Sequence, residues 1–377
     1  MFRLAWRQLL LDPARTLLTA LAIGAVVTVI LVLSGFEQGQ YYQLKQAVLD
    51  RKADLIALQS GVANLLAARS SLPQLTRIYV EDIPGVKIAH PMTALPVMYQ
   101  KGGHKMPIYL MVYDTRGGPV KVIDGKAKQK GNDIIIDSSI ANKLNVKVGD
   151  DFIISDFTFK VSGITEGAAA LFTAMAFITY DGMIDLFLES EIAPDISTFP
   201  LLSFLLVDLK KGADREQVRR SIENAVPAVD VYTPEALAKN GANLGKEILG
   251  PVMGLLVNVG YIIGLLVITL ISSAEARHRL RGFGVMKALG FSHAKLVLAL
   301  GQQIVLLLLI ALPIGFLMAL VLASIFNTTV PLYIVRITEP IVLGQTLIGT
   351  ALFAMVGALI PLRMIRRADP MIAFQEA

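Results

Sequence analysis

Four stretches of the chain contain no charged residue and are long enough to cross a membrane as helices. A helix needs roughly 20 apolar residues to cross the ~30 Å hydrocarbon core of a bilayer. The third stretch, residues 296–335, exceeds that length, and Pro331 predicts that its helix ends near Phe326. The predicted spans cover residues 16–36, 248–273, 296–325 and 341–362.

The long segment between the first two spans, residues 37–247, has the pattern of a folded domain. Short runs rich in β-branched and aromatic residues alternate with turn residues, which is typical of strands. These runs are VKIAH, IYLMVYD, DIIID, DFIIS, FTFKVSGI, AFITY and SFLLVDL. Two helical patterns, DSSIANKLNV and ADREQVRRSIENAV, interrupt them, with Ser138 and Asp214 as expected N-caps. We therefore expect an α-helical membrane protein with four transmembrane helices and a large α+β domain inserted between the first and the second.

Both ends of this segment predict helical stalks that continue the spans. An apolar stripe at three- and four-residue spacing predicts the first stalk, and Arg51 is its one break. The stripe consists of Tyr41, Leu44, Val48, Leu55 and Leu58. The stretch PEALAKNGANLGKEILG predicts the second stalk, weakened by Gly241 and Gly245.

Composition and charge fit this interpretation. The chain is 54% hydrophobic and only 17% charged, which is too apolar for a soluble protein of this length. Basic residues gather beside one end of each span, and such loops stay in the cytoplasm. These residues are Arg3, Arg7, Arg15, Arg277, Arg279, Arg281, Lys287, Lys295, Arg363, Arg366 and Arg367. The net charge of +5 therefore comes from topology and not from a nucleic-acid surface.

This orientation divides the rest of the chain. The expected cytoplasmic parts are an amphipathic elbow helix at residues 1–15, a coupling hairpin at 274–295 and a tail at 363–377, while residues 37–247 and the short loop 326–340 lie outside. A solvated start is the alternative to the elbow. We expect the first span to be retained, because its apolar run exceeds the 7 to 15 residues of a signal peptide and LSGFEQG has no small-x-small cleavage site.

The sequence contains no residue pattern that indicates a catalytic site. The spans hold no ionisable residue of the kind that marks a proton or ion route, and no Walker A pattern occurs. The chain has no cysteine, and its four histidines, His90, His104, His278 and His293, lack metal-ligand spacing. We expect a non-catalytic chain that binds no metal or cofactor of its own. Glycines four apart, at Gly250, Gly254, Gly260 and Gly264, favour close helix packing or a dimer face, although glycine is also simply common in membrane helices.

The cytoplasmic segment RHRLRGFGVMKALGFS, residues 277–292, combines positive charge with an apolar stripe. Leu280, Phe283, Met286 and Leu289 recur at every third position, and Gly290 suits a helix C-terminus in the left-handed conformation. The preference of basic residues for cytoplasmic loops accounts for the arginines. It does not account for exposed apolar side chains at the tip of the segment.

This segment resembles the coupling segment of the FtsX and MacB-like permeases of ABC transporters, the four-span type VII architecture, and the chain is most similar to the MacB and DevC-like branch. LAWRQLLLDPARTLLTALAIG is similar to the elbow and first helix of that family, DSSIANKLNVKVGDDFIISDFTFKVSGI to its extracytoplasmic head, and IPLRMIRRADPMIAF to its tail. One position departs from the pattern, because Gly282 stands where many relatives have Glu.

The resemblance implies a permease subunit in the bacterial plasma (inner) membrane that converts ATP hydrolysis on a separate ATPase dimer into movement of its outer domain. It implies ATP and Mg bound by that partner, a permease homodimer, and an adaptor with an outer-membrane channel for export of an amphiphilic, lipid-like or drug-like substrate. The residues it assigns to ATPase coupling are Arg277, Arg279, Arg281, Phe283, Gly284, Val285, Met286, Lys287, Ala288, Leu289 and Gly290. A membrane regulator that controls a cell-wall hydrolase through its outer domain is the alternative.

Overall fold

The computed structural model describes residues 12–66, 70–101, 104–170, 172–191, 202–278, 292–330 and 332–359. Within these ranges the chain forms two compact units. The span unit comprises residues up to 38, residues from 249 to 328 and residues from 335 onward. The head unit comprises residues 39–248 together with residues 329–334.

The span unit is built from long apolar helices. Four helices are long and apolar enough to cross a membrane, in agreement with the sequence prediction. They are α2 (Pro13–Leu49), α7 (Pro234–His278), α9 (His293–Thr329) and α10 (Pro340–Gly357). Side chains from all four form one buried cluster. The α2 and α7 helices also supply residues 39–49 and 234–248 to the head unit.

Small residues bring α2 and α9 into close contact within the span unit. A Cβ added to Gly315 would lie 2.7 Å from the carbonyl oxygen of Gly24. The buried hydroxyl of Thr28 lies 2.8 Å from the same oxygen and 3.0 Å from the carbonyl oxygen of Gly315. This is the helix-to-helix hydrogen bonding expected of a polar residue inside a span.

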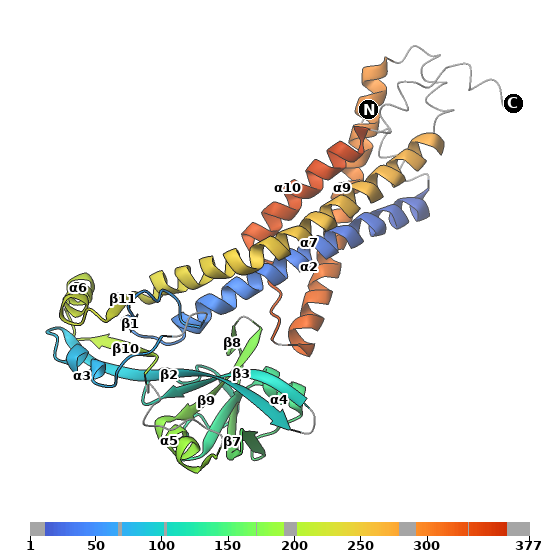
Figure 1. Ribbon diagram of the computed structural model, residues 1–377. Helices are drawn as coiled ribbons and strands as arrows, with labels where there is room; N and C mark the ends of the chain where they lie inside the picture. The colour runs from blue at the N-terminus through green and yellow to red at the C-terminus, as the bar shows by residue number, and fades with distance from the viewer. Residues whose placement is uncertain are drawn as a thin grey trace. The chain divides into compact units, whose positions relative to one another are not determined.

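The head unit is α+β, as expected, and is organised around an eleven-stranded sheet in the described residues (Figure 1). Its strands are β1 (Leu55–Gln59), β2 (Val86–Lys101), β3 (His104–Tyr113), β4 (Val122–Gly125), β5 (Asp133–Asp137), β6 (Asp151–Ile154), β7 (Phe157–Thr165), β8 (Ala169–Ala170), β9 (Thr173–Thr179), β10 (Phe204–Leu209) and β11 (Val229–Tyr232). Its short helices are α3 (Thr76–Glu81), α4 (Ser138–Leu144), α5 (Tyr180–Glu189) and α6 (Arg215–Ala225).

Part of this sheet closes into a barrel. The strand order is β11-β1-β10-β2-β3-β9-β5-β7-β4, and β6 pairs with both β2 and β7. The ring from β2 through β3, β9, β5, β7 and β6 therefore returns to β2 at the pair Tyr99 and Ile154. Closure removes free strand edges and encloses an aromatic and aliphatic core that includes Phe152 and Phe159.

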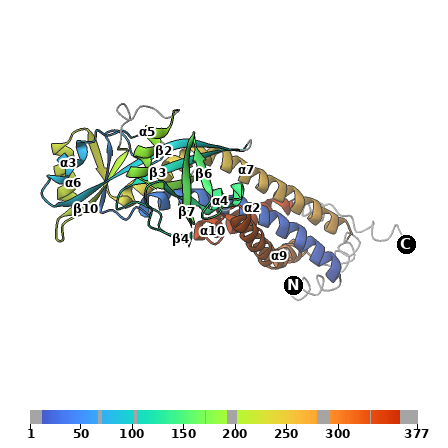
Figure 2. The same ribbon diagram turned by 90° about the horizontal axis from the view of Figure 1, so that it is seen from below.

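The other part of the sheet, β11-β1-β10 and the start of β2, carries helices on both faces. Side chains alternate between faces along a strand, so Leu55 and Ala57 of β1 pack with α3 and α6, whereas Ile56 and Leu58 pack with the ends of α2 and α7. Figure 2 shows α3 and α6 beside this part of the sheet. The ends of α2 and α7 thus form one complete layer of the head unit.

Two local predictions need correction. The first stalk helix ends at Leu49, so Leu55 and Leu58 lie in strand β1 on opposite faces and do not continue the helical stripe of Tyr41, Leu44 and Val48. Helix α4 is capped by Asp137, whose carboxylate accepts from the Ser139 amide, and not by Ser138. The cap at Asp214 of α6 is confirmed, with its carboxylate accepting from the amides of Glu216 and Gln217.

Candidate functional site

Most of the predicted coupling segment lies outside the described residues. Arg277 lies in the last turn of α7 with an exposed side chain. The remaining residues assigned by resemblance, from Arg279 to Gly290, and the departure at Gly282 fall in the range that the structure does not describe.

The four predicted packing glycines have different surroundings in the span unit. A Cβ on Gly260 would lie 3.3 Å from Ile30 of α2, and a Cβ on Gly264 would lie 2.9 Å from Val26 and 3.2 Å from Phe353 of α10. A Cβ on Gly254 would meet no atom within 4 Å, and Gly250 is half-buried. Gly260 and Gly264 therefore lie at close approaches within this chain, whereas Gly254 borders open space.

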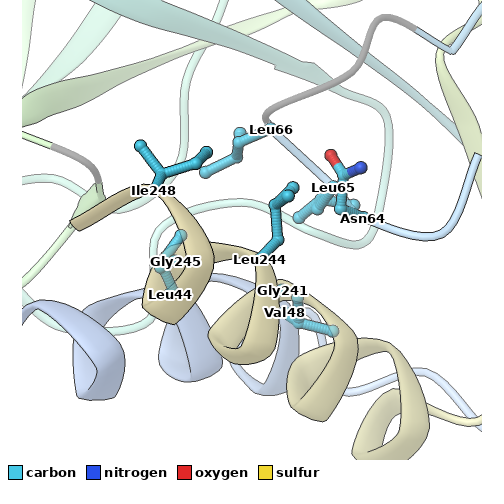
Figure 3. Close-up of a pocket in the computed structure, with 9 residues that line it drawn as sticks. All are labelled: Leu44, Val48, Asn64, Leu65, Leu66, Gly241, Leu244, Gly245 and Ile248. Carbon is cyan, nitrogen blue, oxygen red and sulfur yellow. The ribbon is translucent and has the colours of Figure 1, made fainter. Parts of the chain in front are cut away.

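Inside the head unit, the end of α2 and the start of α7 pack tightly against each other (Figure 3). A Cβ on Gly245 would lie only 2.4 Å from the Cδ1 atom of Leu44 and 3.5 Å from the ring of Tyr41. The ammonium group of Lys246 lies 5.8 Å from the centre of that ring, within reach of a cation–π interaction. Absence of a side chain at Gly245 is what allows this approach.

A small cavity lies at the same contact, between α2, α7 and the loop after β1 (Figure 3). Leu44 and Val48 line it from α2, Gly241 and Leu244 from α7, and Leu65 from the loop. Its volume of about 10 Å³ is close to that of a single water-sized probe. The space left between the two helices and the loop is therefore about that of one water molecule.

These two glycines of α7 make a matched pair for substitution. Alanine gains about 1 kcal/mol of helix propensity over glycine at either position. A Cβ at Gly241 meets no atom within 4 Å, so Gly241→Ala is expected to raise the melting temperature of the full chain in detergent. Gly245→Ala pushes against Leu44, and overpacking of this kind costs about 1–3 kcal/mol, so the melting temperature is expected to fall. An equal rise in both variants would show that the α2–α7 contact tolerates separation.

Arg51, just beyond the end of α2, is buried in the head unit with 3% of its surface exposed. Its guanidinium donates to the carbonyl of Gly117, lies 3.5 Å from the carbonyl of Gly118, and lies 5.4 Å from the centre of the Phe177 ring. Burial lowers the pKa of Arg51 to about 10, and the neighbouring carboxylate of Asp50 opposes this shift. The side chain is therefore a cation at neutral pH, held by carbonyl dipoles and an aromatic face.

The loop that accepts these bonds is also fixed on its other side. Arg116 donates to the carbonyl of Lys52 and forms a 3.2 Å ion pair with Asp208 of β10. The same carboxylate lies 3.4 Å from Nε2 of His90, whose Nδ1 lies 2.9 Å from the hydroxyl of Thr115. Residues 114–118 thus connect the end of α2 to strands β2 and β10.

The peptide between α9 and α10 is a third contributor to the head unit. Leu332 is 7% exposed and belongs to the barrel core, and its carbonyl accepts from Nε2 of Gln43 at 3.2 Å. The ring of Tyr333 lies 5.9 Å from that of Phe172. We call the end of α2, the start of α7 and residues 329–334 together the joint.

The described side chains of the joint hold chain segments together. Among the described residues, no group of His, Asp and Glu side chains could hold a metal ion. Arg51 beside the joint is bound to carbonyls, Lys246 lies over the ring of Tyr41, and the apolar members are interdigitated. What this arrangement can do is keep the ends of three chain segments fixed in the head unit. From the sequence, Arg51 was noted only as a break in the apolar stripe, although a single charge inside such a pattern is a signal of a buried, paired side chain. Leu332 was given no role.

Comparison with known proteins gives matches along nearly the whole chain. The MacB-like periplasmic core domain matches residues 16–225, and the FtsX-like permease C-terminal domain matches residues 254–370. An uncharacterized ABC transporter permease of Mycobacterium bovis is 23% identical over 373 residues, covering 98% of this chain and 96% of that protein. An uncharacterized ABC transporter permease of Mycobacterium tuberculosis is 23% identical over 371 residues with the same coverage.

Two solved structures match about half of the chain. The periplasmic region of MacB from Actinobacillus actinomycetemcomitans has a TM-score of 0.35 at 10% identity, covering 49% of this chain and 91% of that one. The extracellular domain of the ABC-type transporter YknZ from Gram-positive bacteria has a TM-score of 0.35 at 14% identity, covering 48% and 99%. The family assignment rests on the match at residues 16–225, which alone spans more than half of the chain. With the second match covering most of the remainder, this protein belongs to the FtsX/MacB-like family of ABC transporter permeases.

Proposed function

We propose that this permease transmits movement from a separate ATPase to its head unit, and so drives export of an amphiphilic, lipid-like or drug-like substrate. The observation that carries the proposal is the joint. Helices α2 and α7 are continuous from the apolar spans to residues that pack as a layer of the head unit. A displacement of either helix along its axis acts directly on the sheet, because Arg51, Gly245 and Leu332 leave little room for slippage.

The proposed arrangement in the membrane follows the basic residues. Both termini and residues 274–295 face the cytoplasm, and the head unit lies outside the plasma membrane. The partner is an ABC-type ATPase dimer that binds ATP and Mg and grips the coupling hairpin around Phe283 to Leu289. The twofold symmetry of an ATPase dimer favours two copies of the permease. An adaptor with an outer-membrane channel completes the export route.

The test measures the movement of the head unit while the partner ATPase goes through its nucleotide cycle. Lys211 is exposed in the turn after β10, and the chain has no cysteine, so Lys211→Cys gives one labelling site per copy. With the ATPase in proteoliposomes, we expect the distance between spin labels on two copies to shift by several ångströms between the nucleotide-free and the vanadate-trapped states. An unchanged distance during continued ATP turnover would refute transmission, and absence of any inter-copy distance would refute the homodimer.

The coupling hairpin is tested in the same preparation. Phe283→Asp or Met286→Asp puts a charge into the proposed apolar contact, so we expect loss of the co-purified ATPase and of the distance shift. Phe283→Leu keeps an apolar side chain and serves as the control that retains both. Undiminished co-purification of the ATPase with the Asp variants would remove these residues from the contact.

A further inference from the structure

A crevice of about 500 Å³ lies in the head unit, between α3, strand β2 and the loop that follows β3. This volume is in the range of about 300–1,000 Å³ that small-molecule sites occupy. Pro91 and Leu202 line it with buried apolar surface, whereas Leu75 and Ile78 line it with side chains that are more than half exposed. The crevice therefore offers apolar contact at both its floor and its rim.

Two groups of opposite charge line this crevice without forming an ion pair with each other. Nε of Arg77 lies 3.2 Å from the carboxylate of Glu81, which also accepts from the amide of Ala89. The other two nitrogens of the Arg77 guanidinium have no protein partner in the part of the chain that the structure describes. The carboxylate of Asp114 is exposed and likewise has no hydrogen bond or ion pair within those residues. A cation and an anion are thus both available to a ligand.

Tyr180, which also lines the crevice, lies near both charges. Its hydroxyl lies 3.0 Å from that of Thr93. Burial raises the pKa of Tyr180, the hydrogen bond with Thr93 opposes this rise, and the charges of Asp114 and Arg77 act on the same hydroxyl in opposite directions. The cation and the anion therefore lie around one tyrosine, where a single small ligand can reach both.

The ligand that complements these groups has one charge of each sign. The planar guanidinium of Arg77 presents N–H donors to a carboxylate, and the carboxylate of Asp114 accepts from an ammonium group. A ligand with a single charge would cover the other lining charge without giving it a partner, which is unfavourable. A zwitterion with an apolar body therefore fits both the charges and the apolar walls.

A membrane lipid fits this crevice less well. Five of its nine described lining residues carry a charged, amide or hydroxyl group, and these are Gln74, Arg77, Glu81, Asp114 and Tyr180. An acyl chain laid along them would separate these polar groups from water without replacing the hydrogen bonds that water makes. The crevice is therefore suited to a small molecule that is soluble in water.

We propose that this crevice binds a short apolar peptide with free ends, its carboxylate at Arg77 and its ammonium group at Asp114. The bound peptide connects α3 to residues 114–118, which hold the end of α2. The proposal goes beyond the transmission of movement by this permease and does not depend on it. Binding is measured without an ATPase, so its failure leaves the test of the movement of the head unit unaffected.

The experiment is a calorimetric titration of the full-length permease in detergent with the dipeptide dileucine and with two capped forms of it. N-acetyl-dileucine lacks the ammonium group, and dileucine amide lacks the carboxylate. We expect the wild type to bind dileucine about fivefold more tightly than either capped form, the size of effect that one charge interaction of about 1 kcal/mol gives.

Two variants assign each preference to one side chain. Asp114→Asn is expected to bind dileucine and N-acetyl-dileucine with equal affinity, while it still prefers dileucine to the amide. Arg77→Gln is expected to show the reverse, with equal affinity for dileucine and its amide and a retained preference over the acetylated form. Asp82→Asn is the matched control, because Asp82 is also exposed but does not line the crevice, and it should keep both preferences.

Melting temperatures verify that the three variants are folded. Absence of dileucine binding by the wild type, or equal affinity for all three peptides, would overturn the proposal. So would loss of either preference in Asp82→Asn, because the charges would then act from the surface in general. A dileucine capped at both ends that binds as tightly as the free dipeptide would also overturn it, and would indicate an internal segment of a partner protein as the occupant.

Discussion

Arg51→Ala is expected to destabilise the head unit by at least about 3 kcal/mol, the sum of the lower ends of two separate costs. Two terms add up. The carbonyls of Gly117 and Gly118 lose their donor, and a buried unsatisfied polar group costs about 1–3 kcal/mol. Truncating a long buried side chain against Phe177 also leaves a cavity, which costs about 2–5 kcal/mol for large-to-small changes. Thermal and denaturant unfolding of the full chain in detergent measure the loss.

Arg51→Met separates the two terms, because methionine refills most of the volume without a donor. We expect it to cost clearly less than alanine, because it loses the same donor but leaves a smaller cavity beside Phe177. In the reconstituted complex, Arg51→Ala is expected to keep its ATPase and reduce the shift of the head unit. A destabilisation below about 1 kcal/mol for Arg51→Ala would show that the end of α2 is held by other contacts.

Leu332→Asp is expected to release residues 329–334 from the head unit. The side chain is 7% exposed within the barrel core, so an aspartate there combines a lost apolar contact with a buried charge, at a cost of about 3–5 kcal/mol. Because Leu332 comes from a separate peptide, the chain can relieve this cost by detaching the peptide while the sheet stays folded. Limited proteolysis between α9 and α10 is expected to become faster, with the remaining head fragments unchanged.

Thr338→Asp is the control for this variant. It adds the same charge to the same connection between α9 and α10, but at an exposed position, and should leave both proteolysis and stability as in the wild type. If Leu332→Asp cleaves no faster than Thr338→Asp, residues 329–334 are held by Tyr333 and Gln43 without help from Leu332. If the whole head unit unfolds, Leu332 is part of its indispensable core.

The membrane architecture could be predicted from the sequence because an uncharged run of about 20 residues rarely occurs outside a membrane span. The strands of the barrel could also be predicted, since runs such as FTFKVSGI alternate buried and exposed residues along β7. The other part of the sheet, around β1, was harder to predict. LIALQ of β1 is buried on both faces, and such a run has no alternation to distinguish it from a helix. For that reason the sequence pattern wrongly assigns Leu55 and Leu58 to the first stalk.

The joint could not be predicted, because it depends on contacts between residues far apart in the chain. Nothing local distinguishes Gly245, which meets Leu44, from Gly241 four residues earlier, which meets no atom within 4 Å. Leu332 lies in a short connection between spans, and no periodicity marks it as part of a barrel core. The orientation of the termini remains a prediction, and so do the coupling residues from Phe283 to Leu289, which the co-purification experiment tests.

The position of Leu332 also bears on how the protein is made. The barrel strands are complete once Thr179 of β9 has been made, and the whole sheet is complete once Tyr232 of β11 has been made. Leu332 is synthesised about one hundred residues later, after α9 has been made. A barrel that folds as the chain is made therefore forms without this side chain and receives it afterwards. Docking of Leu332 is in that case a late step, which joins the connection between α9 and α10 to a barrel made earlier.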